Sequence, residues 1–110
     1  MPISHDAEIS RLTTDYQHGS NPADTIDAAF TAIEESNDPG IFLSLVDRDT
    51  AIAAAEALGR YDPSKPLFGV PFAVKDNIDV AGMPTTAACP DFAYVPEESA
   101  PVVDRLVAAG

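Results

Sequence analysis

The chain has 110 residues, about the length of one small domain, and 18 acidic side chains against 6 basic ones give it a net charge of −12. This balance argues against binding to nucleic acid or to an anionic membrane surface, because both require clustered Lys and Arg. No apolar run approaches the roughly 18 residues of a membrane span, and the first residues lack the order of a secretion signal, so we expect a cytoplasmic protein. Cys89 is the single cysteine, which excludes an intramolecular disulfide.

Chain length and proline content fit a piece of a larger domain at least as well as a complete one. A chain this short buries only roughly 60–65% of its unfolded surface. Seven of the ten prolines lie between Pro63 and Pro101, where they limit regular hydrogen-bonded structure. We therefore expect the stretch 76–96 to be mostly loop.

Two helices are predicted in the first third of the chain. Apolar residues recur at steps of three and four over 9–16 and again over 26–33, which is the pattern of one helical face. Gly19 is a natural stop for the first helix. Asn21 can cap the second helix, and Pro22 suits its first position.

Strands and helices are expected to alternate in the rest of the chain. The apolar run 41–46 predicts a buried strand, and 67–74 predicts a second strand that Pro71 confines to an edge or irregular position. Strong helix formers over 51–58 predict a third helix, and Ser99 can cap a fourth. This order predicts an α/β fold, in which helices pack against a sheet.

Lys75 is the first candidate for chemistry. It directly follows the apolar run 67–74, whereas the other lysine, Lys65, lies in a polar loop flanked by prolines. A lysine at the end of an apolar strand is expected to be partly desolvated, which favours the neutral amine, a base. The alternative is a surface lysine that pairs with Asp76 or Asp79.

Other chemistry-bearing residues form weaker patterns. Metal ligands can be imagined near the start of the chain, but such residues are far more often solvated surface groups: His5, Asp6, Glu8 and His18. Cys89 has no nearby His and is more typical of a small buried apolar group than of a nucleophile. The glycines form no phosphate-binding motif, so neither a metal site nor a phosphate site is predicted.

A contiguous block of eighteen residues is more specific. Residues 69–86, GVPFAVKDNIDVAGMPTT, resemble the first motif block of the amidase signature family, and the similarity covers roughly residues 20–110. The next residues, AACPDFAY at 87–94, most resemble the allophanate hydrolases of that family. Many other members carry Gly-Ser where Ala88 and Cys89 stand here.

The resemblance implies a fold and a set of site residues. The family fold is a mixed central sheet flanked by helices; residues 20–110 would be its N-terminal portion, and residues 1–19 an N-terminal helix suited to dimerisation. The implied mechanism uses a Ser–cis-Ser–Lys triad, with Lys75 as the base that draws a proton from the bridging serine. The implied role of four further motif residues is to fix the loop around the lysine: Asp76, Asn77, Thr85 and Thr86.

The implied function is hydrolysis of a small-molecule amide, allophanate, with release of ammonia during urea or cyanuric-acid breakdown. No metal, nucleotide or organic cofactor is implied, and a homodimer is expected. The block that carries both serines is absent, because the chain ends at Gly110, so this polypeptide alone is expected to be inactive. Two alternatives remain: the glutamine-hydrolysing subunit of an amidotransferase, which shares the Lys75 block, and a non-catalytic assembly module.

Overall fold

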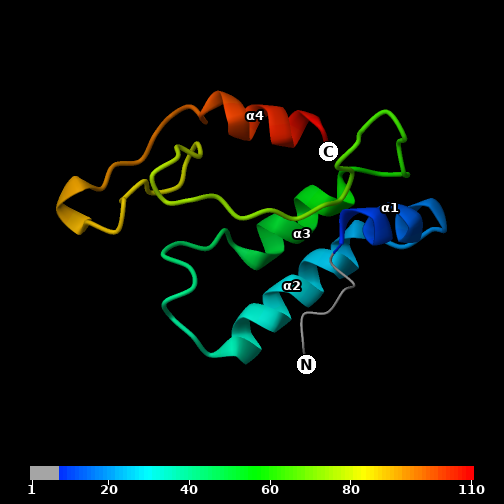
Figure 1. Ribbon diagram of the computed structural model, residues 1–110, viewed down its shortest axis with the longest axis horizontal. Coiled ribbons are helices and arrows are strands. Elements are labelled where there is room, and N and C mark those ends of the chain that lie inside the picture. Colours follow the sequence, from blue (N-terminus) through cyan, green and yellow to red (C-terminus); the bar gives the residue numbers. More distant parts are fainter. Residues whose placement is uncertain (1–7) are drawn as a thin grey trace.

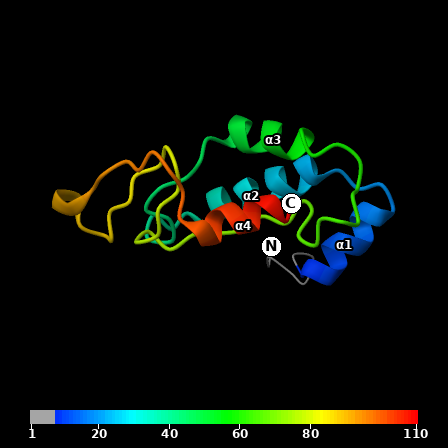
Figure 2. The same cartoon turned by 90° about the horizontal axis from the view of Figure 1, so that it is seen from above.

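The computed structural model describes residues 8–110. Its elements in chain order are α1 (Ile9–Gln17), α2 (Pro22–Ser36), α3 (Arg48–Glu56), the short 3-10 helix η2 (Pro90–Phe92) and α4 (Pro101–Ala108). Helices α2 and α3 pack against each other, and α1 lies at the opposite end of the molecule from η2 (Figures 1 and 2). Residues 85–94, which carry η2, project away from the helices, and we call this segment the arm (Figures 1 and 2).

Side chains cap the starts of two helices, and the cap of α2 is the predicted one. The side chain of Asn21 accepts a hydrogen bond from the backbone N–H of Ala23 at 2.9 Å, directly before Pro22. The carboxylate of Asp47 accepts one from the N–H of Thr50 at 3.0 Å, which caps α3. These bonds satisfy backbone donors that the first turn of a helix otherwise leaves unpaired.

The start of α4 differs from the prediction. Its cap residue is Ala100, and no side chain caps it. The hydroxyl of Ser99 instead accepts a hydrogen bond from the backbone N–H of Ala81 at 2.9 Å. The predicted capping role of Ser99 is therefore wrong, because this hydroxyl ties the preceding loop to the start of α4.

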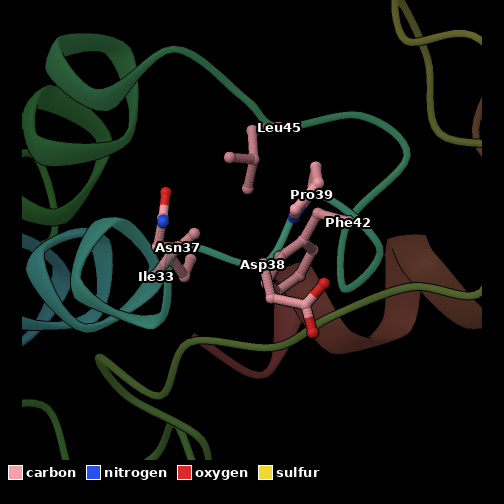
Figure 3. Close-up of a pocket in the computed structure, with 6 residues that line it drawn as sticks. All are labelled: Ile33, Asn37, Asp38, Pro39, Phe42 and Leu45. Atoms are coloured by element: carbon pink, nitrogen blue, oxygen red, sulfur yellow. The ribbon is translucent and has the colours of Figure 1, made fainter.

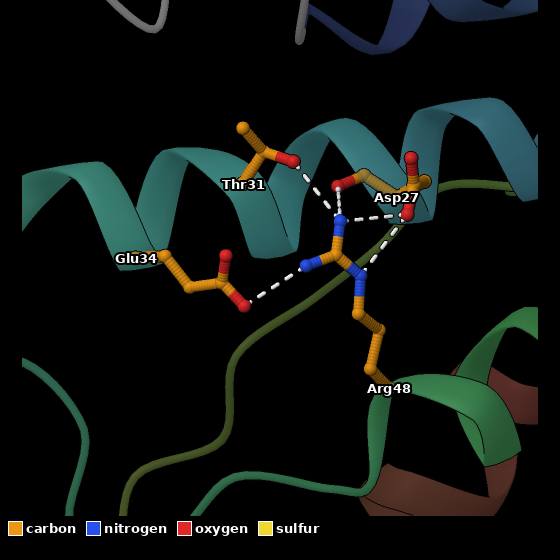
Figure 4. Close-up of polar contacts among 4 residues, drawn as sticks. All are labelled: Asp27, Thr31, Glu34 and Arg48. Carbon is orange, nitrogen blue, oxygen red and sulfur yellow. Dashed lines mark hydrogen bonds and ion pairs between the residues drawn. The ribbon is translucent and has the colours of Figure 1, made fainter.

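One guanidinium joins α3 to α2 (Figure 4). Arg48, the first residue of α3, contacts Asp27 at 2.7 Å and Glu34 at 2.9 Å, and it donates to the hydroxyl of Thr31 at 3.0 Å. The planar guanidinium suits this arrangement, since its several N–H groups point in different directions within one plane. This cluster links the start of α3 to the exposed side of α2.

The core is small and centres on three buried side chains, Leu12, Tyr16 and Phe68. The rings of Tyr16 and Phe68 meet edge to face, with centroids 5.8 Å apart. The Tyr16 hydroxyl donates to the carbonyl oxygen of Gly69 at 2.8 Å and lies 2.8 Å from the hydroxyl of Thr25. Burial raises the pKa of Tyr16. The core therefore joins α1 to the segment that precedes Lys75.

The two predicted strands are wrong for this structure. Segments 41–46 and 67–74 contain no strand, and the one β-bridge described within residues 8–110 joins Thr85 to Tyr94. An apolar run becomes a strand only where a neighbour supplies hydrogen-bond partners, and Pro71 cannot donate at all. The mixed central sheet and the α/β class are therefore not confirmed for the described residues.

Two backbone hydrogen bonds join the last residues of the chain to the turn at residues 66–69. The backbone N–H of Leu67 donates to the carbonyl of Ala109 at 2.9 Å, and that of Gly69 donates to the carbonyl of Gly110 at 3.1 Å. These two bonds bring the end of α4 beside the start of the segment that leads to Lys75. The start of the segment that leads to Lys75 is thus held between α1 and the residues that follow α4.

Candidate active site

Lys75 lies at the end of the apolar segment and is exposed in the described part of the chain. The predicted desolvation of this amine is therefore not found within residues 8–110. The backbone carbonyl of Lys75 accepts a hydrogen bond from the N–H of Ile78 at 2.9 Å, which forms a tight turn. Asn77, also predicted to support the site, lies in this turn and is exposed.

Asp76 is the centre of a hydrogen-bonded cluster directly after Lys75. Its carboxylate accepts a hydrogen bond from the hydroxyl of Thr86 and another from the N–H of Ala88 at 3.3 Å. Its backbone carbonyl accepts bonds from the N–H groups of Thr86 and Ala87, at 3.2 and 3.1 Å. We call this group, residues 76 and 86–88, the Asp76 cluster; it closes a loop whose first residue follows the lysine.

The Asp76 cluster holds two alanines in an unusual backbone conformation. Ala87 and Ala88 have φ angles of 48° and 58°, in the left-handed region that non-glycine residues rarely adopt. The N–H of Ala88 donates to the Thr86 hydroxyl at 3.1 Å, and the N–H of Cys89 donates to the Thr86 carbonyl at 2.8 Å. These bonds keep the turn in place despite its cost of about 1–2 kcal/mol per residue. Nothing in the alanine pair predicts this conformation.

A second cluster involves the neighbouring threonine. The hydroxyl of Thr85, a side chain only 2% exposed, donates to the carboxylate of Asp79 at 2.9 Å. The same carboxylate accepts a bond from the hydroxyl of Tyr94 at 2.5 Å, and Thr85 and Tyr94 also exchange two backbone hydrogen bonds. The hydrogen bond from the Tyr94 hydroxyl to the Asp79 carboxylate raises the pKa of Tyr94. We call these three residues the Asp79 cluster.

The structure thus brings together three of the predicted site residues, Asp76, Thr85 and Thr86, on the loop after Lys75. The contributions of Asp79 and Tyr94 are not predicted from the sequence. Asp79 lies within the quoted motif block, and this position could have indicated a role in the site. From the sequence alone, Asp79 is expected only as a surface partner for the lysine. Tyr94 lies fifteen residues from Asp79, and no local pattern indicates that pairing.

Acid is expected to weaken the Asp76 cluster. The Thr86 hydroxyl and then the neighbouring backbone N–H groups hold the pKa of Asp76 below its ordinary value of 3.8. The ionised carboxylate therefore contributes stability above that pH, and this contribution is lost as the pH falls through the lowered pKa. Carbon-detected NMR titration of the Asp76 carboxyl is expected to show this lowered midpoint.

The Thr86 hydroxyl can be tested by two matched variants. Thr86→Val removes the hydroxyl at similar volume and is expected to move the Asp76 midpoint up toward its ordinary value. Thr86→Ser keeps the hydroxyl and is expected to leave the midpoint close to that of the unmodified chain. An equal midpoint in the unmodified chain and in Thr86→Val would contradict the assignment.

A cavity of about 340 Å³ lies elsewhere, between the end of α2 and the loop that follows it (Figure 3). It is mostly apolar, with one carboxylate on its wall, and is lined by Ile33, Asn37, Asp38, Pro39, Phe42 and Leu45. None of the predicted site residues lines this cavity. It therefore offers no substrate pocket beside Lys75.

The structure also bears on the weaker candidates, Cys89 and the imagined metal ligands. Cys89 is exposed, so its predicted burial is wrong. His5 and Asp6 lie outside the described residues, and from residue 8 onward no group of three or more His, Cys, Asp or Glu side chains is arranged to hold a metal ion. In the same part of the chain, no helix has both the length and the apolar character needed to cross a membrane.

Comparison with known proteins agrees with the motif around Lys75. The chain is 46% identical to urea amidolyase of Saccharomyces cerevisiae over 63% of its length, which is 4% of that protein. It is 36% identical to a Glutamyl-tRNA(Gln) amidotransferase subunit of Exiguobacterium sp. over 96% of its length, or 22% of that protein. The solved structure of Kluyveromyces lactis allophanate hydrolase matches 94% of this chain and 18% of that one, at 31% identity and a TM-score of 0.71.

These matches identify the family and its fold. The chain spans at most about a fifth of the length of the proteins just compared. A family model described as Amidase matches residues 24–110, which include the loop with both hydrogen-bonded clusters. The described elements also superpose on a fragment of the allophanate hydrolase fold. The chain therefore belongs to the amidase signature family.

Proposed function

We propose that this chain is the N-terminal part of a hydrolase that releases ammonia from allophanate, with Lys75 as the base of a Ser–cis-Ser–Lys triad. The observation that carries the proposal is the match to Kluyveromyces lactis allophanate hydrolase over 94% of this chain. The stretch AACPDFAY at 87–94 supports this substrate, because among the members of the family it most resembles the allophanate hydrolases. The similarity to urea amidolyase agrees with a role in urea breakdown.

The proposed chemistry is that of an activated nucleophile. The Lys75 amine takes a proton from a serine held across a cis peptide, and that serine activates the nucleophilic serine; both belong to polypeptide outside this chain. Attack on the amide carbonyl forms an acyl-enzyme and releases ammonia, and water then hydrolyses the acyl-enzyme. The Asp76 cluster supports this role for Lys75, because a fixed loop restricts where the amine can reach.

Exposed apolar side chains support the proposal that more polypeptide covers this chain. Ile41 and Leu43 are 54% and 61% exposed, and Val102 and Val107 on α4 are 52% and 64% exposed. The radius of gyration, 14.7 Å, also exceeds the roughly 13 Å expected for a compact domain of this length.

The second candidate is the glutamine-hydrolysing subunit of an amidotransferase, which the match to the Exiguobacterium protein favours. The net charge of −12 fits a complex that handles tRNA less well than it fits a hydrolase of a small molecule. An ammonia-release assay of the full-length protein on allophanate and on glutamine separates the two. Ammonia from allophanate is expected, and activity on glutamine alone would reject the proposal.

The remaining expectations concern location and assembly. We place the full-length hydrolase in the cytoplasm as a homodimer, with residues 1–19 as part of the contact. Ile9 on α1 is 51% exposed and is suited to such a contact. Light scattering of the full-length protein that gives a monomer mass would reject the dimer.

A further inference from the structure

The geometry points to Asp79 as a positioning residue for Lys75, a role that rests on the proposed function. One carboxylate oxygen of Asp79, Oδ1, accepts hydrogen bonds from two hydroxyl groups, that of Thr85 at 2.9 Å and that of Tyr94 at 2.5 Å. Hydroxyl-to-carboxylate bonds are stronger than bonds between neutral groups. Asp79 therefore joins Thr85 to Tyr94, the two residues that also form a β-bridge.

The effect of Asp79 reaches Lys75 through adjacent residues. Asp79 accepts a hydrogen bond from Thr85, and the next residue in the chain is Thr86. Thr86 donates to Asp76, which directly follows Lys75. Thr85 is 2% exposed, so its hydroxyl has little access to water as a replacement partner. Loss of the Asp79 carboxylate would leave that hydroxyl unpaired and loosen the neighbouring Asp76 cluster.

Asp79 also connects this loop to α4. Its backbone carbonyl accepts a hydrogen bond from the N–H of Ala100, the cap residue of α4, at 2.9 Å. Two residues later the connection is repeated, because the N–H of Ala81 donates to Ser99. The backbone of this loop is therefore held against the start of α4, and the Asp79 side chain in turn holds Thr85.

The test compares Asp79→Ala, Asp79→Asn and a control in the full-length hydrolase. Asp79→Ala removes the acceptor of both hydroxyl groups and is expected to lower kcat about 10- to 100-fold, the effect of a misplacement of about 1 Å. KM is expected to stay within about twofold, because the proposal assigns Asp79 to the position of Lys75 and not to substrate binding. Asp79→Asn keeps an acceptor oxygen in the same place and is expected to recover most of the lost kcat. Asp91→Ala, an exposed acid of η2 in the same arm, is the matched control and is expected to retain full kcat.

Tyr94→Phe provides a second variant that keeps the ring and removes one of the two bonds. It is expected to lower kcat several-fold, less than Asp79→Ala, even if the alanine variant fails to fold. The folded fraction of each variant is measured by circular dichroism and used to correct kcat. Unchanged kcat in Asp79→Ala and Tyr94→Phe, or a loss that the folded fraction explains fully, would overturn the assignment.

The choice of substrate keeps this test separate from the proposed function. Each kcat is measured on whichever of allophanate and glutamine the unmodified hydrolase uses. Activity on glutamine alone would reject the proposed substrate, while the ratios between variants would still decide the role of Asp79. A hydrolase inactive on both substrates would overturn both proposals.

Discussion

Replacement of Lys75 by alanine in the full-length hydrolase is expected to abolish ammonia release, by roughly 10⁴-fold or more in kcat. A serine hydroxyl is a weak nucleophile at neutral pH, and the base that accepts its proton makes it competent. Removal of the amine leaves only the contribution of substrate binding and of backbone donors to the oxyanion. Ammonia release under saturating allophanate measures the loss.

The fold is expected to survive this change. The Lys75 side chain is exposed, and its contact with the N–H of Ile78 uses the backbone carbonyl, which alanine retains. Lys65→Ala is the matched control, because Lys65 is the only other lysine and lies in a separate loop. Turnover retained in Lys75→Ala would contradict the proposed mechanism and favour a non-catalytic assembly module.

The largest loss of stability is expected for Gly69→Ala. A Cβ at position 69 would lie 2.6 Å from Cε2 of Tyr16 and 3.1 Å from Cβ of Pro22. The Tyr16 ring cannot easily move away, since it is buried in the core and its hydroxyl donates to the Gly69 carbonyl. The φ angle of +69° adds the cost of a left-handed alanine.

Gly59→Ala separates the two costs. Gly59 has the same φ of +69°, but a Cβ there would meet nothing within 4 Å. Gly59→Ala is therefore expected to lower the free energy of unfolding by about 1 kcal/mol, and Gly69→Ala by a further 1–3 kcal/mol or so from the clash. Urea unfolding of the 110-residue chain, followed by circular dichroism, measures both. Equal losses would show that the ring clash at position 69 is relieved without cost.

Local features of the fold can be predicted from the sequence. Asn21 and Asp47 cap helices because their side chains need only reach backbone groups two or three residues away. The predicted face of the first helix is confirmed for Leu12 and Tyr16, which lie one helical turn apart and enter the core, whereas Ile9 is exposed. Such features depend on neighbours in the sequence, which one chain alone specifies.

Features that depend on distant partners could not be predicted. The apolar run 41–46 has the composition of a strand, but a strand also needs hydrogen-bond partners that the described residues do not supply. The pairing of Asp79 with Tyr94 joins residues fifteen positions apart, across a loop without regular structure. The motif block predicted Lys75 and four residues near it as the site, whereas the contacts that hold this loop could be described only from the structure.

The left-handed turn at Ala87 and Ala88 has a consequence for how this sequence can evolve. Glycine at either position would relieve backbone strain, and Asn or Asp would tolerate the same φ angle. Branched side chains such as Val or Ile would clash with their own backbone there. Substitutions at both positions should therefore be restricted to small residues and to Asn or Asp, although both positions are exposed to solvent.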